Sequence, residues 1–174
     1  MSILENNNVF LRAPEPEDLN ILYQWENNTN IWQVSQTLVP FSKYILKKYI
    51  ENSHLDIYEI KQARFIICST KEKRPVGAID IFDFDPANAK AGVGILIGSE
   101  NDYNKAYASN ALQLLIDYCF SVLKLHQLYC NILESNKNSL ALFEKYGFKI
   151  TGKKEDWVKT TNGYENEFLL QLIR

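Results

Sequence analysis

The chain has 174 residues, a length that suits one domain built around a substantial core. Apolar residues make up 46% of the chain, charged residues make up 23%, and the formal net charge is -2 at pH 7. Without a basic excess there is no electrostatic reason to expect a nucleic-acid partner or binding to an anionic membrane.

The first half of the chain alternates chain breakers with periodic apolar segments. Leu19 and Leu22 recur at helical spacing, and Ile79 and Ile81 alternate with polar neighbours, as in a strand with one wet face. Ser42 stands where a helix N-cap is expected. The predicted elements are a strand over 9–13, a helix over 18–26, a loop over 27–40, a helix after Ser42, and strands over 64–69 and 76–84.

The second half contains the clearest helix, whose apolar stripe runs from Ala108 to Leu123 along one face. Gly147 stands where a left-handed cap would end a shorter helix, and Asn162 followed by Gly163 marks a hairpin turn. The predicted elements are a strand over 91–97, the long helix, a strand over 128–133, a helix over 139–146 and two strands within 148–173.

This order of elements predicts an α/β (α+β) fold, with a central sheet and helices on both of its faces. The strand-helix-strand unit over 91–133 should be a right-handed crossover, which makes its two strands parallel. No linker rich in Pro, Gly or Ser divides the chain, so we expect a single domain over 1–174.

The cysteines and histidines favour a cytoplasmic protein without a metal. Cys68, Cys119 and Cys130 stand in apolar segments without C-x-x-C spacing, so we expect buried, reduced thiols. His54 and His126 lie far apart and have no acidic partner at a metal-ligand spacing. Residues 1–8 lack the features of a secretion signal, and no apolar run is long enough to span a membrane.

Two segments carry the polar groups best suited to chemistry. Between Ile97 and Ala108 a strand ends and the long helix begins, and the first turn of a helix offers unpaired N–H groups to a phosphate. Lys105 adds a formal positive charge there. In the other segment, Asn136 and Ser139 stand at a helix start, where they either cap that helix or hold an amide-rich ligand beside the sheet.

Three stretches carry a resemblance to the GNAT superfamily of acetyltransferases. Residues 91–111, A-G-V-G-I-L-I-G-S-E-N-D-Y-N-K-A-Y-A-S-N-A, resemble its acetyl-CoA-binding motif, A-E-x-G-x-x-I, a polar turn and Q/R-G-K-G-x-A. Residues 136–148, N-K-N-S-L-A-L-F-E-K-Y-G-F, resemble N-x-x-S-x-x-L-Y-E-K-x-G-F, and residues 10–19 resemble the family's first strand and helix. Within the superfamily the chain is similar to bacterial spermidine acetyltransferases, particularly over 117–129, and to acetyltransferases of ribosomal-protein N-termini.

The resemblance implies a mixed, mostly antiparallel sheet whose fourth and fifth strands splay apart around the pantetheine arm of acetyl-CoA. It also implies which residues contact this co-substrate, through backbone groups on the fourth strand, the turn before the long helix, and the shorter helix. These residues are Ile95, Leu96, Ile97, Tyr103, Asn104, Lys105, Ala106, Tyr107, Ala108, Ser109, Asn136, Ser139 and Phe143.

The family's reaction is direct attack of an amine on the thioester, which needs a base for the amine proton and a donor for the leaving thiolate. The resemblance makes Asp80 a candidate base and Ser139 and Tyr146 candidate donors. The expected acceptor-site residues are Glu26, Trp32, Asp80 and Asp83. The alternative is that the acids among them belong to a solvated sheet face and a helix end.

Four positions depart from the family pattern. Gly92 stands where the fourth strand often carries Glu, and Phe143 replaces a Tyr that protonates the thiolate. Asn104 and Ala106 replace the two glycines of G-K-G. Because alanine has a Cβ and tolerates positive φ poorly, we expect a tighter or distorted phosphate-binding turn.

Three functions therefore stay open. The first is an acetyltransferase acting on a polyamine, a protein N-terminus or another small amine, although residues 32–40 contain none of the acids that polyamine enzymes carry after the first helix. The second is an acyl-CoA-binding module without turnover. The third is a structural or interaction protein that has lost the co-substrate site. A homo-oligomer that pairs through the C-terminal strands is implied by the resemblance.

Overall fold

The computed structural model describes residues 2–35, 37–53 and 55–174, so the expectations that touch Gln36 and His54 lie outside the described residues. Seven strands form one sheet in the order β1-β2-β3-β4-β5-β7-β6. All neighbouring strands are antiparallel except β4 and β5, which run parallel. The predicted mixed, mostly antiparallel sheet with one parallel pair is confirmed.

The elements match most of the predicted order. Their bounds are β1 (Val9–Arg12), η1 (Pro16–Asp18), α1 (Leu19–Glu26), α2 (Thr29–Ser35), α3 (Lys43–Glu51), α4 (Ile57–Ile60), β2 (Ala63–Ser69), β3 (Pro75–Asp85), β4 (Lys90–Ile97), η2 (Glu100–Asp102), α5 (Tyr107–Ser121), β5 (Gln127–Leu133), α6 (Lys137–Lys145), β6 (Lys149–Thr160) and β7 (Gly163–Ile173). The cap predicted at Ser42 is confirmed, because its side chain accepts a hydrogen bond from the Ile45 N–H. Gly147 follows α6 with a φ of 89°.

The expected loop over 27–40 is wrong at its centre, where α2 lies. The polar run before α2 is a helix start: the Asn28 side chain accepts a hydrogen bond from the Asn30 N–H at 3.1 Å. The four-residue helix α4 also went unpredicted, and Asp56 caps it by accepting from the Tyr58 N–H at 2.7 Å. Asparagine and aspartate favour both caps and turns, so composition alone did not separate the two.

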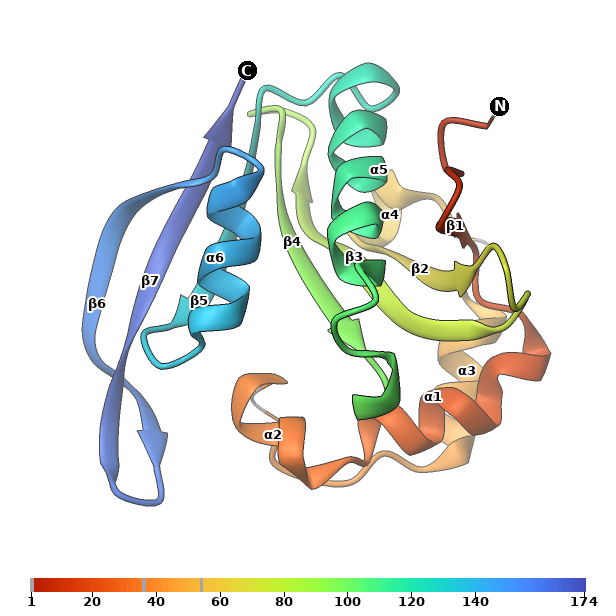
Figure 1. Ribbon diagram of the computed structural model, residues 1–174, viewed down its shortest axis with the longest axis horizontal. Coiled ribbons are helices and arrows are strands. Elements are labelled where there is room, and N and C mark those ends of the chain that lie inside the picture. Colours follow the sequence, from red (N-terminus) through yellow and green to blue (C-terminus); the bar gives the residue numbers. More distant parts are fainter. Residues whose placement is uncertain (1, 36, 54) are drawn as a thin grey trace.

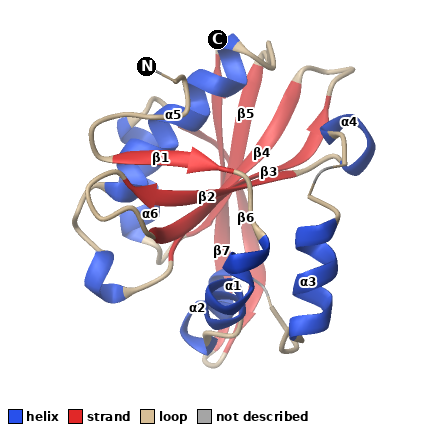
Figure 2. Cartoon of the chain, turned by 90° about the vertical axis from the view of Figure 1, so that its right-hand side faces the viewer, coloured by secondary structure: helices blue, strands red, loops and turns tan. Residues whose placement is uncertain are grey.

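Helices cover both faces of the sheet, as predicted. Figure 2 shows α5 and α6 on one side of the strands and α3 on the other. On the α5 side, Leu112 and Ile79 belong to one buried cluster, and on the opposite side Leu22 and Trp25 of α1 share a second cluster with Ile66. Alternate residues of β2 and β3 therefore contribute to two separate cores.

Three further expectations concern the chain as a whole. Cys68, Cys119 and Cys130 are free and buried, as predicted. No helix in the described part of the chain is long and apolar enough to cross a membrane. Within that same part, no three His, Cys, Asp or Glu side chains are grouped so that they could hold a metal ion.

Candidate active site

The two parallel strands stay together for only three residue pairs. β4 and β5 pair at Lys90 with Gln127, at Ala91 with Leu128, and at Gly92 with Tyr129. Beyond Gly92 the strands diverge toward α2 (Figure 1). β4 residues 93–97, which include the expected co-substrate contacts Ile95, Leu96 and Ile97, therefore have β3 as their only partner strand among the described residues.

The turn over 103–108 follows η2, which comes after β4, and leads into the first residues of α5. Asn104 and Ala106 in this turn have left-handed backbones, with φ of 61° and 60°. Ala106 is the N-cap residue of α5, and none of the described side chains caps the helix there. The first N–H groups of a 15-residue helix therefore lack a side-chain acceptor, which is the arrangement that binds phosphate groups.

Asn104 and Ala106 adopt the left-handed conformation although neither is a glycine. The backbone conformation typical of glycine is kept, although a non-glycine residue in this conformation costs about 1–2 kcal/mol. Asparagine accepts it more readily than alanine does, because its short polar side chain can bond locally. The neighbouring structure must therefore hold Ala106 in place.

A buried carboxylate provides part of that hold. Asp102 is 4% exposed and accepts hydrogen bonds from Arg74 at 2.7 and 2.9 Å and from the Lys105 Nζ at 3.2 Å. The Arg74 hydrogen bonds hold the pKa of Asp102 below its ordinary value, against burial, and Lys105 adds to the lowering. The Asn8 side chain also donates to the Lys105 carbonyl at 3.1 Å. The turn is thus fastened to Arg74, which immediately precedes β3, and to the N-terminal segment.

Helix α6 brings the second expected group of residues toward α5. The Asn136 Oδ1 accepts from the Ser139 N–H at 3.2 Å, so Asn136 caps α6. The Tyr146 hydroxyl lies 2.7 Å from the Ser109 Oγ, in the first turn of α5. Phe143 is 3% exposed and packs edge-to-face on Phe148, with ring centroids 5.0 Å apart. Tyr146 and Ser109 therefore meet near the 103–108 turn, while Phe143 belongs to the core.

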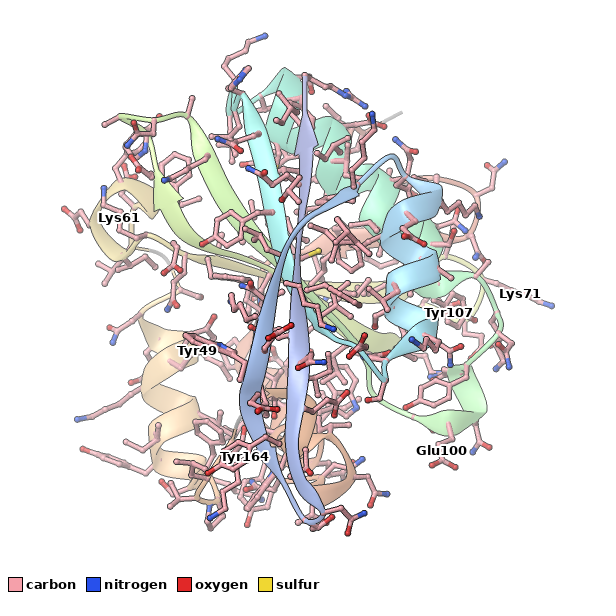
Figure 3. All side chains as sticks on the ribbon, turned by 90° about the vertical axis from the view of Figure 1, so that its left-hand side faces the viewer. Tyr49, Lys61, Lys71, Glu100, Tyr107 and Tyr164 are labelled. Carbon is pink, nitrogen blue, oxygen red and sulfur yellow. The ribbon has the colours of Figure 1, made fainter. Side chains whose placement is uncertain are left out.

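An ion cluster lies on the opposite face of the sheet. Arg64 donates to both carboxylate oxygens of Asp80, at 2.7 and 2.8 Å, and also pairs with Glu26 at the end of α1. Burial acts to lower the pKa of Arg64, but Asp80 and Glu26 outweigh it and the net direction is upward. The Tyr49 ring lies 5.5 Å from the guanidinium, and Tyr49 extends from α3 toward the sheet (Figure 3).

Arg64 is a site residue that sequence reasoning missed. It faces Asp80 directly in the β2–β3 register, which only the paired strands reveal. The available signal was an arginine at the start of an otherwise apolar strand, where a charged side chain needs a partner.

A cavity of about 280 Å³ opens beside this cluster, between α3 and the β2–β3 pair. It is lined by Glu26, Phe41, Ile45, Leu46, Tyr49, Gln62, Ala63, Arg64, Asp80, Ile81 and Phe82. Two of the four expected acceptor residues, Glu26 and Asp80, therefore lie together. The other two are not among the lining residues: the Trp32 indole donates to the Glu26 carbonyl at 2.9 Å, and Asp83 accepts from the Tyr129 hydroxyl at 3.0 Å.

The departure at Gly92 has a structural cause. Gly92 lies opposite Phe82 in the β3–β4 register, and a Cβ at residue 92 would overlap the Phe82 ring. The same ring packs edge-to-face on Tyr129, with centroids 5.8 Å apart. Burial raises the pKa of the Tyr129 phenol to about 12, and Asp83 adds to the rise. An aromatic wall thus fills the volume where the family motif often has a glutamate.

Comparison with known proteins finds a matching family and similar acetyltransferases. A family model described as "Acetyltransferase (GNAT) domain" matches residues 8–149. The chain is 26% identical over 147 residues to the spermidine N(1)-acetyltransferase of Escherichia coli (strain K12), which covers 84% of this chain and 76% of that protein. It is 25% identical over 175 residues to an uncharacterized N-acetyltransferase, p20, of Bacillus licheniformis. This match covers 100% of this chain and 97% of that protein.

Solved structures show the same fold. The spermidine N-acetyltransferase of Vibrio cholerae, in complex with CoA and spermine, superposes with a TM-score of 0.86 at 22% identity, covering 97% of this chain and 96% of that one. Another structure of the Vibrio cholerae enzyme is described as dodecameric. The chain belongs to the GNAT acetyltransferase domain family.

Proposed function

We propose that this GNAT acetyltransferase uses acetyl-CoA and transfers the acetyl group to a primary amine. One observation carries the proposal: β4 and β5 part at Gly92, and β4 continues into the uncapped start of α5 through the left-handed residues Asn104 and Ala106. Parted strands suit a narrow amide-bearing chain, and a helix N-terminus suits the pyrophosphate at its end. These backbone features support CoA binding although the side chains differ from the motif.

The co-substrate would be held mostly by main-chain groups. Residues 95–97 would offer backbone hydrogen bonds to the pantetheine arm, and residues 103–108 would hold the pyrophosphate. Lys105 is partly exposed beside its Asp102 ion pair, so its charge adds to the attraction for phosphate. Bound acetyl-CoA supplies the thioester that the amine attacks.

The acceptor would enter on the α3 face. An ammonium has no lone pair, so a carboxylate must take its proton before attack, and Asp80 and Glu26 are the carboxylates that line the cavity. Ser139 and Tyr146 remain the proposed proton donors for the thiolate. Assembly into a homo-oligomer stays a prediction for this chain.

A CoA-binding module without turnover is the second candidate. It is favoured by Phe143, which is buried and has no proton to give, and by Gly92, which removes a common candidate base. It predicts that acetyl-CoA binds but that no amine speeds thiol release.

Calorimetric titration with acetyl-CoA, followed by thiol release with added amines, tests both functions. Ala106→Asp sets a negative charge where the pyrophosphate is proposed, and we expect its acetyl-CoA affinity to fall on the order of tenfold or more. Ala106→Asn has the same shape without the charge and is the matched control. Equal affinities for the two variants would place the phosphates elsewhere, and no binding at millimolar acetyl-CoA would contradict the proposal.

A further inference from the structure

The cavity between α3 and the β2–β3 pair holds one excess negative charge. Glu26 and Asp80 are two carboxylates, and Arg64 is the one cation between them, so one negative charge is left over. The other lining side chains among the described residues are uncharged, and most are apolar. A partly buried excess charge favours a counter-ion, and an ammonium is the one that an amine acetyltransferase would receive.

The surroundings of the cavity disfavour a second and third ammonium. Residues 27–44, which lead from α1 into α3, contain no aspartate or glutamate. Helix α3 instead carries the exposed residues Lys43, Lys47 and Lys48. These lysines do not line the cavity, and Glu51 is the one acid of α3, so a polycation that extends along this helix would meet more like charges than carboxylates.

The size of the cavity points the same way. At about 280 Å³ it lies just below the usual volume of small-molecule sites, which span about 300–1,000 Å³. Phe41, Ile45, Tyr49 and Phe82 form much of its wall. Such a lining gains free energy from an apolar body and little from a peptide backbone, whose polar groups need partners.

Phe82 connects this cavity to the place where the strands part. Its ring lines the cavity and lies against Gly92, which is the last β4 residue paired with β5. An amine bound against Phe82 therefore lies next to the start of the divergence. The Phe82 ring, which occupies the volume where the family motif often has a glutamate, would thus contact the acceptor and contribute to its selection.

We propose that the acceptor is a small primary monoamine with an apolar body, such as an arylalkylamine. This inference rests on the proposed acetyl transfer. The ammonium binds at Glu26 and Asp80, and the apolar body packs against Phe82 and Tyr49. The ammonium gives one proton to the Asp80 carboxylate, the nitrogen forms the amide N–C bond as the thioester C–S bond breaks, and the nitrogen's second proton goes to the thiolate.

A substrate panel tests the assignment on the full-length protein. With acetyl-CoA held saturating, kcat/KM is measured for 2-phenylethylamine, spermidine and a short peptide with a free N-terminus. We expect 2-phenylethylamine to exceed the other two by about tenfold or more, the discrimination that an apolar pocket typically provides. A kcat/KM for spermidine or the peptide equal to or above that of 2-phenylethylamine overturns the inference.

Two variants test separately the contribution of the excess negative charge and that of the Phe82 ring. Glu26→Gln keeps the shape and the Arg64–Asp80 pair but removes the excess charge, and it should raise KM for 2-phenylethylamine about tenfold with a smaller change in kcat. Phe82→Ala should lower the preference for 2-phenylethylamine over spermidine about tenfold. Tyr58→Ala is the control, because Tyr58 is an aromatic residue that packs on Phe84 and does not line the cavity. Thermal unfolding checks that each variant is folded.

Failure of the substrate class and failure of the proposed function give different results. If acetyl-CoA binds and spermidine is the better acceptor, transfer stands and the monoamine inference falls. If acetyl-CoA does not bind, transfer falls, and calorimetry of 2-phenylethylamine with wild type and Glu26→Gln still tests the cavity. Weaker binding to the variant supports the amine site, whereas equal binding or none overturns it.

Discussion

On the α5 side of the sheet, Asn104 and Ala106 replace the glycines of the family motif, yet both keep a left-handed backbone. On the α3 side, Gly92 stands where the family motif often has a glutamate, and the Phe82 ring fills that volume. The changes at Asn104 and Ala106 alter side chains but keep the backbone conformation. The change at Gly92 alters the volume and the charge beside the acceptor cavity. A ligand bound by main-chain groups survives changes of residue type, while a ligand bound by side chains does not. We therefore expect the co-substrate to be shared with relatives and the acceptor to differ.

The largest expected effect comes from the buried carboxylate that fastens the 103–108 turn. Asp102→Asn removes charge-assisted hydrogen bonds to Arg74 and Lys105, which should lower the free energy of unfolding by about 1.5–3 kcal/mol. Acetyl-CoA affinity should fall as well, because the turn loosens. Urea unfolding and calorimetry measure the two effects.

Glu72→Gln is the control for this variant, since Glu72 pairs with the same arginine at an exposed position. We expect its free energy of unfolding to change by less than about 1 kcal/mol. Equal losses for the two variants would mean that Asp102 has no special role in holding the turn.

Two glycines on one face of β4 allow a test of the Phe82 contact on the acceptor side. Gly92→Ala must displace the Phe82 ring, and we expect the free energy of unfolding to fall by about 1–3 kcal/mol. At Gly94 the nearest atom to an added Cβ is 3.8 Å away, so Gly94→Ala should be close to neutral. In the background of Phe82→Ala, the cost of Gly92→Ala should largely disappear. A full cost without the ring would show that the overlap is not its cause.

A smaller effect of opposite sign is expected in the turn itself. Ala106→Gly relieves the left-handed strain and should raise the free energy of unfolding by roughly 0.5–1 kcal/mol. Ala108→Gly, two residues later within α5, should lower it by about 1 kcal/mol. Chemical denaturation of both variants measures the sign of each change in the free energy of unfolding. If Ala106→Gly were also destabilising, the alanine would not be strained.

The smallest effect is a dependence on pH. Arg74 holds the pKa of Asp102 below its ordinary value of about 3.9, against the effect of burial. The stability from this carboxylate is therefore fully present above pH 4 and is lost as the pH falls through the folded-state pKa. The free energy of unfolding of Asp102→Asn should decline less steeply than that of wild type between about pH 5 and pH 2. Parallel curves would contradict the lowered pKa.

The sequence predicted local features better than contacts between strands. The cap at Ser42 and the position of the 103–108 turn depend on neighbouring residues, so they could be read from the chain. The Arg64–Asp80 ion pair and the Phe82–Gly92 contact depend on strand register between segments far apart in sequence. Helix α2 was missed because its cap, Asn28, is equally typical of a turn. Within the candidate site, the position of the 103–108 turn could therefore be predicted from the sequence, whereas the contacts around Arg64 and Phe82 could not.

The buried cysteines have a practical consequence for every assay proposed above. Burial raises the pKa of Cys68, Cys119 and Cys130, to about 12 for Cys119, and only a thiolate reacts quickly with disulfide reagents. A colorimetric thiol reagent added to the native protein should therefore report released CoA against a low background. Once the chain unfolds, the same reagent should count three thiols per molecule, so a rising blank would reveal denatured enzyme before activity is interpreted.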